Sequence, residues 1–284
     1  MVSETLSTGL VGHRFEPITT SWNAKDVMLY ALGVGAKPAA ELDFLYEGTK
    51  NDGPLVLPTY AVIPAMRAMG NLRHVVKLKI QRLLHGEQGI ELLPPLPAKT
   101  EITLESEVSE VWDKGKSGVI GVSALGSDAD GPLFKSHSTL FYIGGGGFGG
   151  EPGPSTKAKN RPPDRQPDLV DYATQPEQGA LYRLSGDQVA LHIDPEFARK
   201  AGYEKPFMHG LCTYGFVGRA ILHGLCGGDP ARFKSMTGRF ADTVQFEDHI
   251  ITKFWHDGPG AAILQVEDQS GAVVLSQARA TFSE

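Results

Sequence analysis

The sequence has few cysteines, no excess of positive charge and no long apolar run. Only two of its 284 residues are cysteines, Cys212 and Cys226, and they do not form a C-x-x-C motif. A disulfide framework is therefore excluded, and a zinc site built on thiolates is not expected. We predict a protein without a metal site that works in a reducing compartment.

The charge balance argues against nucleic acid as a partner. Lysine and arginine number 27 against 33 acidic residues, which gives a net charge of −6. A nucleic-acid surface normally requires a basic stripe. No apolar stretch reaches the roughly 18 residues that span a membrane, and the first residues lack the pattern of a secretory signal. The chain ends in TFSE, unlike the peroxisomal S-K-L signal. We predict a cytoplasmic protein with no membrane partner.

One segment separates the chain into two halves. Residues 144–168, GGGGFGGEPGPSTKAKNRPPDRQPD, are rich in glycine, proline and charge and have neither a helical nor a strand period. This composition predicts a linker. We therefore expect an N-terminal unit over residues 1–143 and a C-terminal unit over residues 169–284.

The two halves resemble each other at a constant offset. The stretch LYALGVGA from Leu29 is similar to LYRLSGDQ from Leu181, and LPTYAVIPAMRAMG from Leu57 to KPFMHGLCTYGFVGRA from Lys205. PLPAKTEITLESEV from Pro95 corresponds to TVQFEDHIITKFW from Thr243. The offset stays near 150 residues in all three cases, which indicates an internal repeat.

Each half also shows the same order of expected elements. An apolar helix comes first, over residues 58–69 and again over residues 210–222. Alternating, β-branched stretches follow at 101–112, 116–125, 133–143, 249–257, 261–268 and 272–282. Alternation with period two and turns such as SDADGP predict antiparallel strands. A long helix on an antiparallel sheet, made twice, is an α+β double hotdog.

The stretch YRLSGDQVALHIDPEFARKAG contains an acid and a base five residues apart, Asp187 and His192. Asp194 is a good N-cap and Pro195 suits the first helical position, which predicts a short helix over residues 195–201. Asp187 and His192 then share the preceding loop. From spacing alone they are either a catalytic pair or an ordinary turn before a capped helix.

A second feature is the sequence FMHGLCTYG, in which Gly210 opens the long apolar helix. The N–H groups of a first helical turn carry the positive end of the helix dipole. Because glycine has no side chain, a ligand carbonyl can approach its N–H closely. Gly210 is thus a candidate oxyanion hole. The alternative is that it only allows close packing of helix and sheet.

These motifs together resemble the MaoC-like, or type 2 (R)-specific, enoyl-CoA hydratases, a family that includes the hydratase part of peroxisomal multifunctional enzyme type 2. The similarity runs through FLYEG, VLPTYAVIP, LLHGEQGIEL and GGGGFGG in the first half. It continues through YRLSGD, LHIDPEFARKAGY and HGLCTYG in the second. The resemblance implies a double hotdog and coenzyme A thioester ligands.

The resemblance also implies roles for particular residues. Asp187 and His192 match the catalytic pair that adds water reversibly to a trans-2-enoyl-CoA, giving a (3R)-3-hydroxyacyl-CoA, and Gly210 matches the oxyanion hole. Coenzyme A is part of the substrate, so no separate cofactor is expected. In the family the first unit is non-catalytic and makes room for a medium, long or bulky acyl tail, and the proline in LPTYAVIPAM fits a short or broken helix there. A homodimer is expected by analogy.

Further residues match positions that line or support the family's site. The acyl-CoA site is matched by His85, Gly86, Lys114 and Phe240. Lys114 is either a phosphate partner or a solvated turn lysine. Tyr30 and Glu47 match residues of the first half that support the active site.

The sequence departs from the family at two places. The motif G-D-x-N-P-L-H reads GDQVALH here, so Val189 replaces an asparagine that could donate and accept hydrogen bonds. After Phe240, the chain carries acids at Asp242, Glu247 and Asp248 where relatives are neutral or basic. Three functions remain: a hydratase with a re-tuned site, a non-catalytic acyl-CoA-binding relative, or a dehydratase acting on a carrier-protein or polyketide-like substrate.

Overall fold

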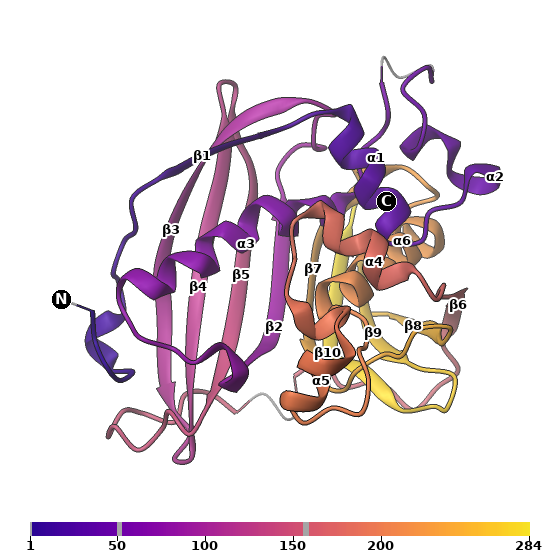
Figure 1. Cartoon of the computed structure of the whole chain (residues 1–284). Helices are drawn as coiled ribbons and strands as arrows, with labels where there is room; N and C mark the ends of the chain where they lie inside the picture. The colour runs from indigo at the N-terminus through magenta and orange to yellow at the C-terminus, as the bar shows by residue number, and fades with distance from the viewer. Residues whose placement is uncertain (1, 50–52, 156–158) are drawn as a thin grey trace.

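Both units share one continuous antiparallel sheet. The computed structural model of the chain describes residues 2–49, 53–155 and 159–284. The sheet has ten strands in the order β1-β3-β4-β5-β2-β7-β10-β9-β8-β6, and helices pack against its two halves (Figure 1). The strands of the first unit are β1 Ile18–Trp22, β2 Leu83–Leu92, β3 Thr100–Asp113, β4 Ser117–Asp128 and β5 Gly131–Ile143. Those of the second are β6 Asp168–Ala173, β7 Phe233–Phe240, β8 His249–His256, β9 Ala261–Glu267 and β10 Val273–Phe282.

The strand order confirms the repeat that the sequence indicates. Read from either outer edge, the first, third, fourth, fifth and second strands of each unit follow one another, and β2 pairs with β7 at the junction. The junction is antiparallel and runs from Glu87↔Arg239 to Glu91↔Ser235. This arrangement confirms the predicted α+β double hotdog, in which two units bury their helices against a single sheet.

The central helices of the two units differ in length. In the second unit α6, Gly210–Leu225, has 16 residues, and nearly all of them are buried. In the first unit a 3₁₀ turn, η3 Pro58–Ala61, precedes the nine-residue α3, Val62–Gly70. Proline lacks the N–H that continues a helix and favours only its first turn, and Pro58 and Pro64 both fall near such starts. The first unit therefore has the short helix that the sequence predicts.

Shorter helices lie in the loops of both units. They are α1 Ala24–Gly33, α2 Pro38–Glu41, α4 Gln178–Tyr182 and α5 Pro195–Lys200, and α1 of the first unit packs against α4 of the second. The remaining 3₁₀ turns are η1 Thr8–Leu10, η2 Leu42–Phe44, η4 Asn71–His74, η5 Ile80–Arg82, η6 Arg183–Ser185, η7 Ala190–His192 and η8 Pro230–Arg232. The carboxylate of Asp194 accepts hydrogen bonds from the N–H groups of Glu196 and Phe197. This cap and the start of α5 at Pro195 confirm the predicted helix.

The described parts of segment 144–168 are tied to the sheet. The carboxylate of Asp113 accepts hydrogen bonds from the N–H groups of Gly115, Gly147 and Gly149. Further along, Asn160 donates to the carbonyl of Gln277 at 2.9 Å. These contacts hold the connection along its path without any helix or strand of its own before β6. Within the described residues, every helix is too short or too polar to span a membrane.

Candidate active site

Asp187 and His192 lie on one irregular loop of the second unit. The loop leaves η6 through Gly186, whose φ of 137° is a conformation that side-chain-bearing residues rarely adopt. One carboxylate oxygen of Asp187 accepts a hydrogen bond of 3.3 Å from the N–H of Val189. The turn η7 then ends at His192. Both ionisable residues are half-buried, so they are reachable from solvent.

A backbone carbonyl orients His192. Its Nδ1 lies 2.9 Å from the carbonyl oxygen of Phe207, an acceptor that requires a proton on Nδ1. In the neutral ring the other nitrogen, Nε2, then carries a lone pair and can accept a proton. The segment just before α6 therefore selects the tautomer of His192 that suits a general base.

The surroundings bring the proton affinities of the pair closer together. Burial raises the pKa of Asp187, although the attraction of His192 acts against this shift. Burial lowers the pKa of His192, although the Phe207 carbonyl and Asp187 act against it. Perturbed pairs of this kind are typical of acid–base sites.

His209 is a buried residue that the sequence reasoning missed. Its Nε2 donates a hydrogen bond of 3.1 Å to the backbone carbonyl of Asp187. Its ring lies 4.0 Å, centroid to centroid, from the ring of His192. Burial and the neighbouring His192 lower the pKa of His209 to about 3, so it stays neutral at physiological pH. It thus joins the loop of Asp187 to the start of α6, and its position directly before Gly210 was the only signal in the sequence.

Gly210 is the first residue of α6, and the aromatic rings of Phe240 and His85 lie beside it. The N–H groups of Cys212 and Thr213 donate to the carbonyl of His209. The side chain of His209 makes no capping hydrogen bond, so the N–H of Gly210 stays available. A Cβ atom at Gly210 would lie 3.2 Å from the ring of Phe240. The ring of Phe240 in turn packs edge-on against that of His85, with centroids 5.0 Å apart. The structure therefore brings Gly210, Phe240 and His85 together.

His85 and Gly86 lie at an irregularity in β2. The register between β2 and β5 shifts between His85 and Glu87, so Gly86 is the bulged residue. A Cβ atom at Gly86 would come within 2.7 Å of the Phe141 ring. The buried Nε2 of His85 has no partner within the described residues, and burial lowers the pKa of this histidine to about 4. A neutral His85 can serve a ligand as acceptor or donor.

Of the remaining predicted residues, Lys114 and Glu47 lie apart from this cluster, whereas Tyr30 reaches it through Tyr182, whose ring lies 5.0 Å from that of His209. Tyr30 is fully buried, with its ring 5.4 Å from that of Tyr60 and 6.1 Å from that of Tyr182. Lys114 is exposed on the turn between β3 and β4, and Glu47 is exposed after η2. Within the described residues, neither side chain forms a hydrogen bond or ion pair with Asp187, His192 or Gly210. The assignments of Lys114 to phosphate and of Glu47 to support of the site stay predictions.

The residues that depart from the family pattern, Val189, Asp242 and Asp248, each form a hydrogen bond within their own loops. The side chain of Val189 is 37% exposed, while its N–H supports Asp187. Asp248 is buried and accepts hydrogen bonds from the N–H groups of His249 and Gln269. Asp242 accepts from the N–H of Thr243. Asp242 and Asp248 therefore have roles in their own loops, and neither needs a role at the ligand.

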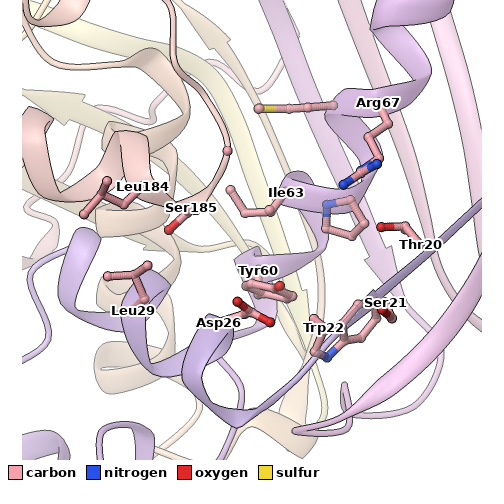
Figure 2. A pocket seen from close by; sticks show the side chains of 13 residues that line it. Thr20, Ser21, Trp22, Asp26, Leu29, Tyr60, Ile63, Arg67, Leu184 and Ser185 are labelled. Atoms are coloured by element: carbon pink, nitrogen blue, oxygen red, sulfur yellow. The ribbon is translucent and has the colours of Figure 1, made fainter.

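A cavity adjoins the loop on the side of the first unit. It measures about 430 Å³, and Leu184, Ser185 and Gly186 form the wall that runs directly into Asp187. The rest of the lining comes from β1, α1, η3 and α3: Thr20, Ser21, Trp22, Asp26, Leu29, Tyr60, Ile63, Pro64, Met66 and Arg67. Figure 2 shows Leu184 and Ser185 on one side and Arg67 and Thr20 on the other. A volume of this size is typical of small-molecule sites.

Two family models match the chain, one in each half. The MFE-2 hydratase 2 N-terminal domain matches residues 21–144, and the MaoC like domain matches residues 157–277. The mouse protein named peroxisomal multifunctional enzyme type 2 is 39% identical over 95% of this chain, which spans 38% of that protein's length. A Dictyostelium discoideum protein named probable enoyl-CoA hydratase 2 is 36% identical, over 94% of this chain and 93% of its own.

The fold also matches a solved structure. The crystal structure of a MaoC-like dehydratase from Phytophthora capsici superimposes with a TM-score of 0.88 at 31% identity, over 98% of both chains. The similarity therefore extends through both units and their junction.

Proposed function

The chain belongs to the MaoC-like family, with an MFE-2 hydratase 2 N-terminal domain in its first half, and from that premise we propose that it is an (R)-specific 2-enoyl-CoA hydratase. The reaction is the reversible addition of water to a trans-2-enoyl-CoA. The observation that carries this proposal is that Asp187 and His192 share one loop and influence each other's charge, with the Nδ1–H of His192 held by the Phe207 carbonyl.

The pair would handle a single water molecule. One member takes a proton from the water as the water oxygen bonds to C3 of the substrate. The electrons of the 2,3-double bond move toward the thioester oxygen, and an enolate results. The proton held by the pair is then delivered to C2, so the product gains one hydroxyl and one hydrogen. Delivery from the same side gives syn addition, and acid–base catalysis of this kind contributes about 10²–10⁴ in rate.

Gly210 would stabilise the enolate. Its N–H stands at the positive end of α6, and the N-cap residue's side chain makes no capping hydrogen bond there. A fixed donor aimed at the oxygen that gains charge lowers the transition-state energy without reorganisation. The neighbouring rings of Phe240 and His85 would shield this oxygen from water, which strengthens the interaction.

The cavity beside the loop supports a medium or bulky acyl chain. Its wall ends at Asp187, so a chain extending from C4 would enter the space that the short α3 leaves. Coenzyme A would extend the other way, past Gly210. We expect acyl-CoA as ligand, a homodimer by analogy with the family, and a cytoplasmic location, although matched relatives include proteins named peroxisomal.

Turnover of a substrate panel tests this function. We expect the purified protein to hydrate crotonyl-CoA or a longer enoyl-CoA, with loss of the conjugated enoyl absorbance and a (3R) product. Asp187→Ala and His192→Ala should lower kcat by about 10² or more, while circular dichroism shows that both variants fold.

Other outcomes would favour the alternatives. Calorimetric binding of acyl-CoA without turnover of short, medium, branched or steroid-tailed enoyl-CoAs would indicate a non-catalytic binding protein, as the substitution at Val189 would allow. Turnover confined to carrier-protein thioesters would indicate the dehydratase alternative.

A further inference from the structure

The cavity beside the catalytic loop contains more polar atoms than a plain hydrocarbon tail requires. Thr20, Ser21, Asp26, Tyr60, Arg67 and Ser185 all contribute to its lining. A site for an unsubstituted alkyl chain gains most from apolar walls, because burying polar groups without partners costs free energy. The composition of this wall therefore points to a ligand that carries a polar group.

Tyr60 provides the most direct observation. The residue is only 4% exposed, it lines the cavity, and its hydroxyl forms no hydrogen bond with any described residue. The rings of Trp22 and Tyr30 hold it in place, with centroids 5.5 and 5.4 Å away. A second unpartnered atom is the buried Oγ of Ser185. The Tyr60 hydroxyl can therefore hydrogen-bond with water or with a polar group of a ligand in the cavity.

Two opposite charges stand beside the Tyr60 hydroxyl. Burial raises the pKa of Tyr60, the negative charge of Asp26 raises it further, and Arg67 acts in the opposite direction. The Asp26 carboxylate accepts a hydrogen bond of 2.9 Å from the N–H of Asn23 and has capacity for another. Arg67 is exposed, and its guanidinium forms no hydrogen bond or ion pair with a described residue.

The position of these groups relates them to the tail of a substrate. Leu184 and Ser185 lie on the side of the catalytic loop, whereas Arg67 and Thr20 lie across the cavity from them (Figure 2). The acid and the base nearly cancel in charge, so the wall does not select an anion. It offers both a donor and an acceptor, and a hydroxyl group needs both.

We propose that the wall formed by Asp26, Tyr60 and Arg67 binds a hydroxyl group on the acyl tail, so that the preferred substrates are enoyl thioesters with a hydroxylated tail. This inference rests on the proposed hydratase function and adds a substrate class to it. Arg67 and Tyr60 donate hydrogen bonds to the hydroxyl oxygen, and the Asp26 carboxylate accepts a hydrogen bond from the hydroxyl group. With a methyl-ended tail, only water could form hydrogen bonds with these three side chains.

The test compares three trans-2-enoyl-CoAs of equal, medium chain length that end in a methyl, a hydroxyl or a carboxylate group. For the wild-type protein we expect kcat/KM to be about fivefold to tenfold higher for the hydroxyl-ended chain than for the methyl-ended chain, as one or two hydrogen bonds provide. The ratio of the two values is the readout, because it cancels any general loss of activity.

Two variants locate the effect. Arg67→Leu and Tyr60→Phe each remove a donor and should bring the ratio close to one. Arg73→Leu removes the same charge from an exposed residue of η4 that does not line the cavity. This control should keep the wild-type ratio.

The possible results separate the two proposals. Turnover of the methyl-ended chain with equal or higher kcat/KM overturns the hydroxyl preference and leaves the hydratase function intact. A preference for the carboxylate overturns it as well, since Arg67 would then act as an anion site. If the ratio also fell to one in Arg73→Leu, the preference for the hydroxyl-ended chain would arise outside the cavity, which overturns the proposed site. Failure to turn over any of the three overturns the hydratase function itself.

Discussion

At the scale of single residues, the proposed catalytic pair, Asp187 and His192, depends on neighbours to which we assign no acid–base step. The carbonyl of Phe207 selects the tautomer of His192, and His209 joins the ring of His192 to the backbone of Asp187. Val189 supports Asp187 only through its N–H, because its apolar side chain can neither donate nor accept. The loop therefore lacks one polar contact that the asparagine of the family motif would supply.

Replacement of Val189 by asparagine tests that reading. We expect Val189→Asn to raise kcat by about twofold to tenfold, which corresponds to one hydrogen bond of roughly 0.5–1.5 kcal/mol. The measurement is steady-state hydration of an enoyl-CoA. Val189→Ala is the control, because it shortens the side chain without adding a polar group, and should stay near the wild-type rate. Equal rates for the asparagine and alanine variants would mean that another group already completes the network.

At the scale of elements, the two central helices have diverged. The first turn of the long α6 follows His209, which contacts the loop of Asp187 and His192, whereas the short α3 borders the cavity. A helix terminus is a suitable place for an oxyanion donor because its N–H groups lack partners within the helix. The two units therefore share one architecture, but their central helices border different parts of the candidate site.

A pair of glycine substitutions in α6 tests the role of its first turn. Gly210→Ala adds a Cβ atom 3.2 Å from the Phe240 ring, beside the proposed oxyanion donor. Gly224→Ala adds one 3.2 Å from the Phe254 ring, near the opposite end of the same helix. We expect kcat/KM to fall about tenfold or more for Gly210→Ala, since blocked access weakens a donor worth about 10²–10³ in rate. The Gly224 variant should keep its activity, and equal losses would remove Gly210 from the mechanism.

At the scale of the whole molecule, a buried ion pair joins the units. Arg219 of α6 donates from Nε to a carboxylate oxygen of Glu41 in α2 at 2.8 Å, and from a second nitrogen to the carbonyl of Val34 at 2.9 Å. Both charged side chains are 2% exposed. Burial acts to raise the pKa of Glu41, but hydrogen bonds and attraction from Arg219 outweigh it and hold the pKa below its usual range.

Glu41→Gln should destabilise the fold by about 3–5 kcal/mol, because it leaves the buried charge of Arg219 without its partner. Urea unfolding at pH 7 measures this difference. The exposed pair of Lys200 and Glu196 provides the control, and Glu196→Gln should change stability by less than about 1 kcal/mol.

The pH dependence of this contribution follows from the lowered pKa. The contribution is complete above the unfolded pKa of about 4.3 and is lost as the pH falls through the lower folded pKa. The difference in the free energy of unfolding between the wild-type protein and Glu41→Gln should therefore become smaller below about pH 4. If this difference in unfolding free energy stayed constant between pH 7 and pH 3, the result would contradict an ionised Glu41.

The sequence alone determined the local and repeating features. Alternation of apolar residues gave the strands, Asp194 and Pro195 gave the start of α5, and the offset between halves gave the duplication. These signals act over a few residues or recur along the chain, so no knowledge of packing is needed to detect them. The loop of Asp187 and His192 and the helix start at Gly210 were found in the same way.

The tertiary structure decided which distant residues meet. The contacts of Phe207 and His209 with His192, and of His85 with Phe240, join segments that lie apart in the sequence. The structure likewise placed Glu47 on the surface and put Glu41 against Arg219. It also formed the polar cavity from four separate elements of the first unit and from Leu184, Ser185 and Gly186 of the second. The physical reason is that burial, tautomer choice and cavity lining depend on contacts across the packed core, which side-chain spacing along the chain does not encode.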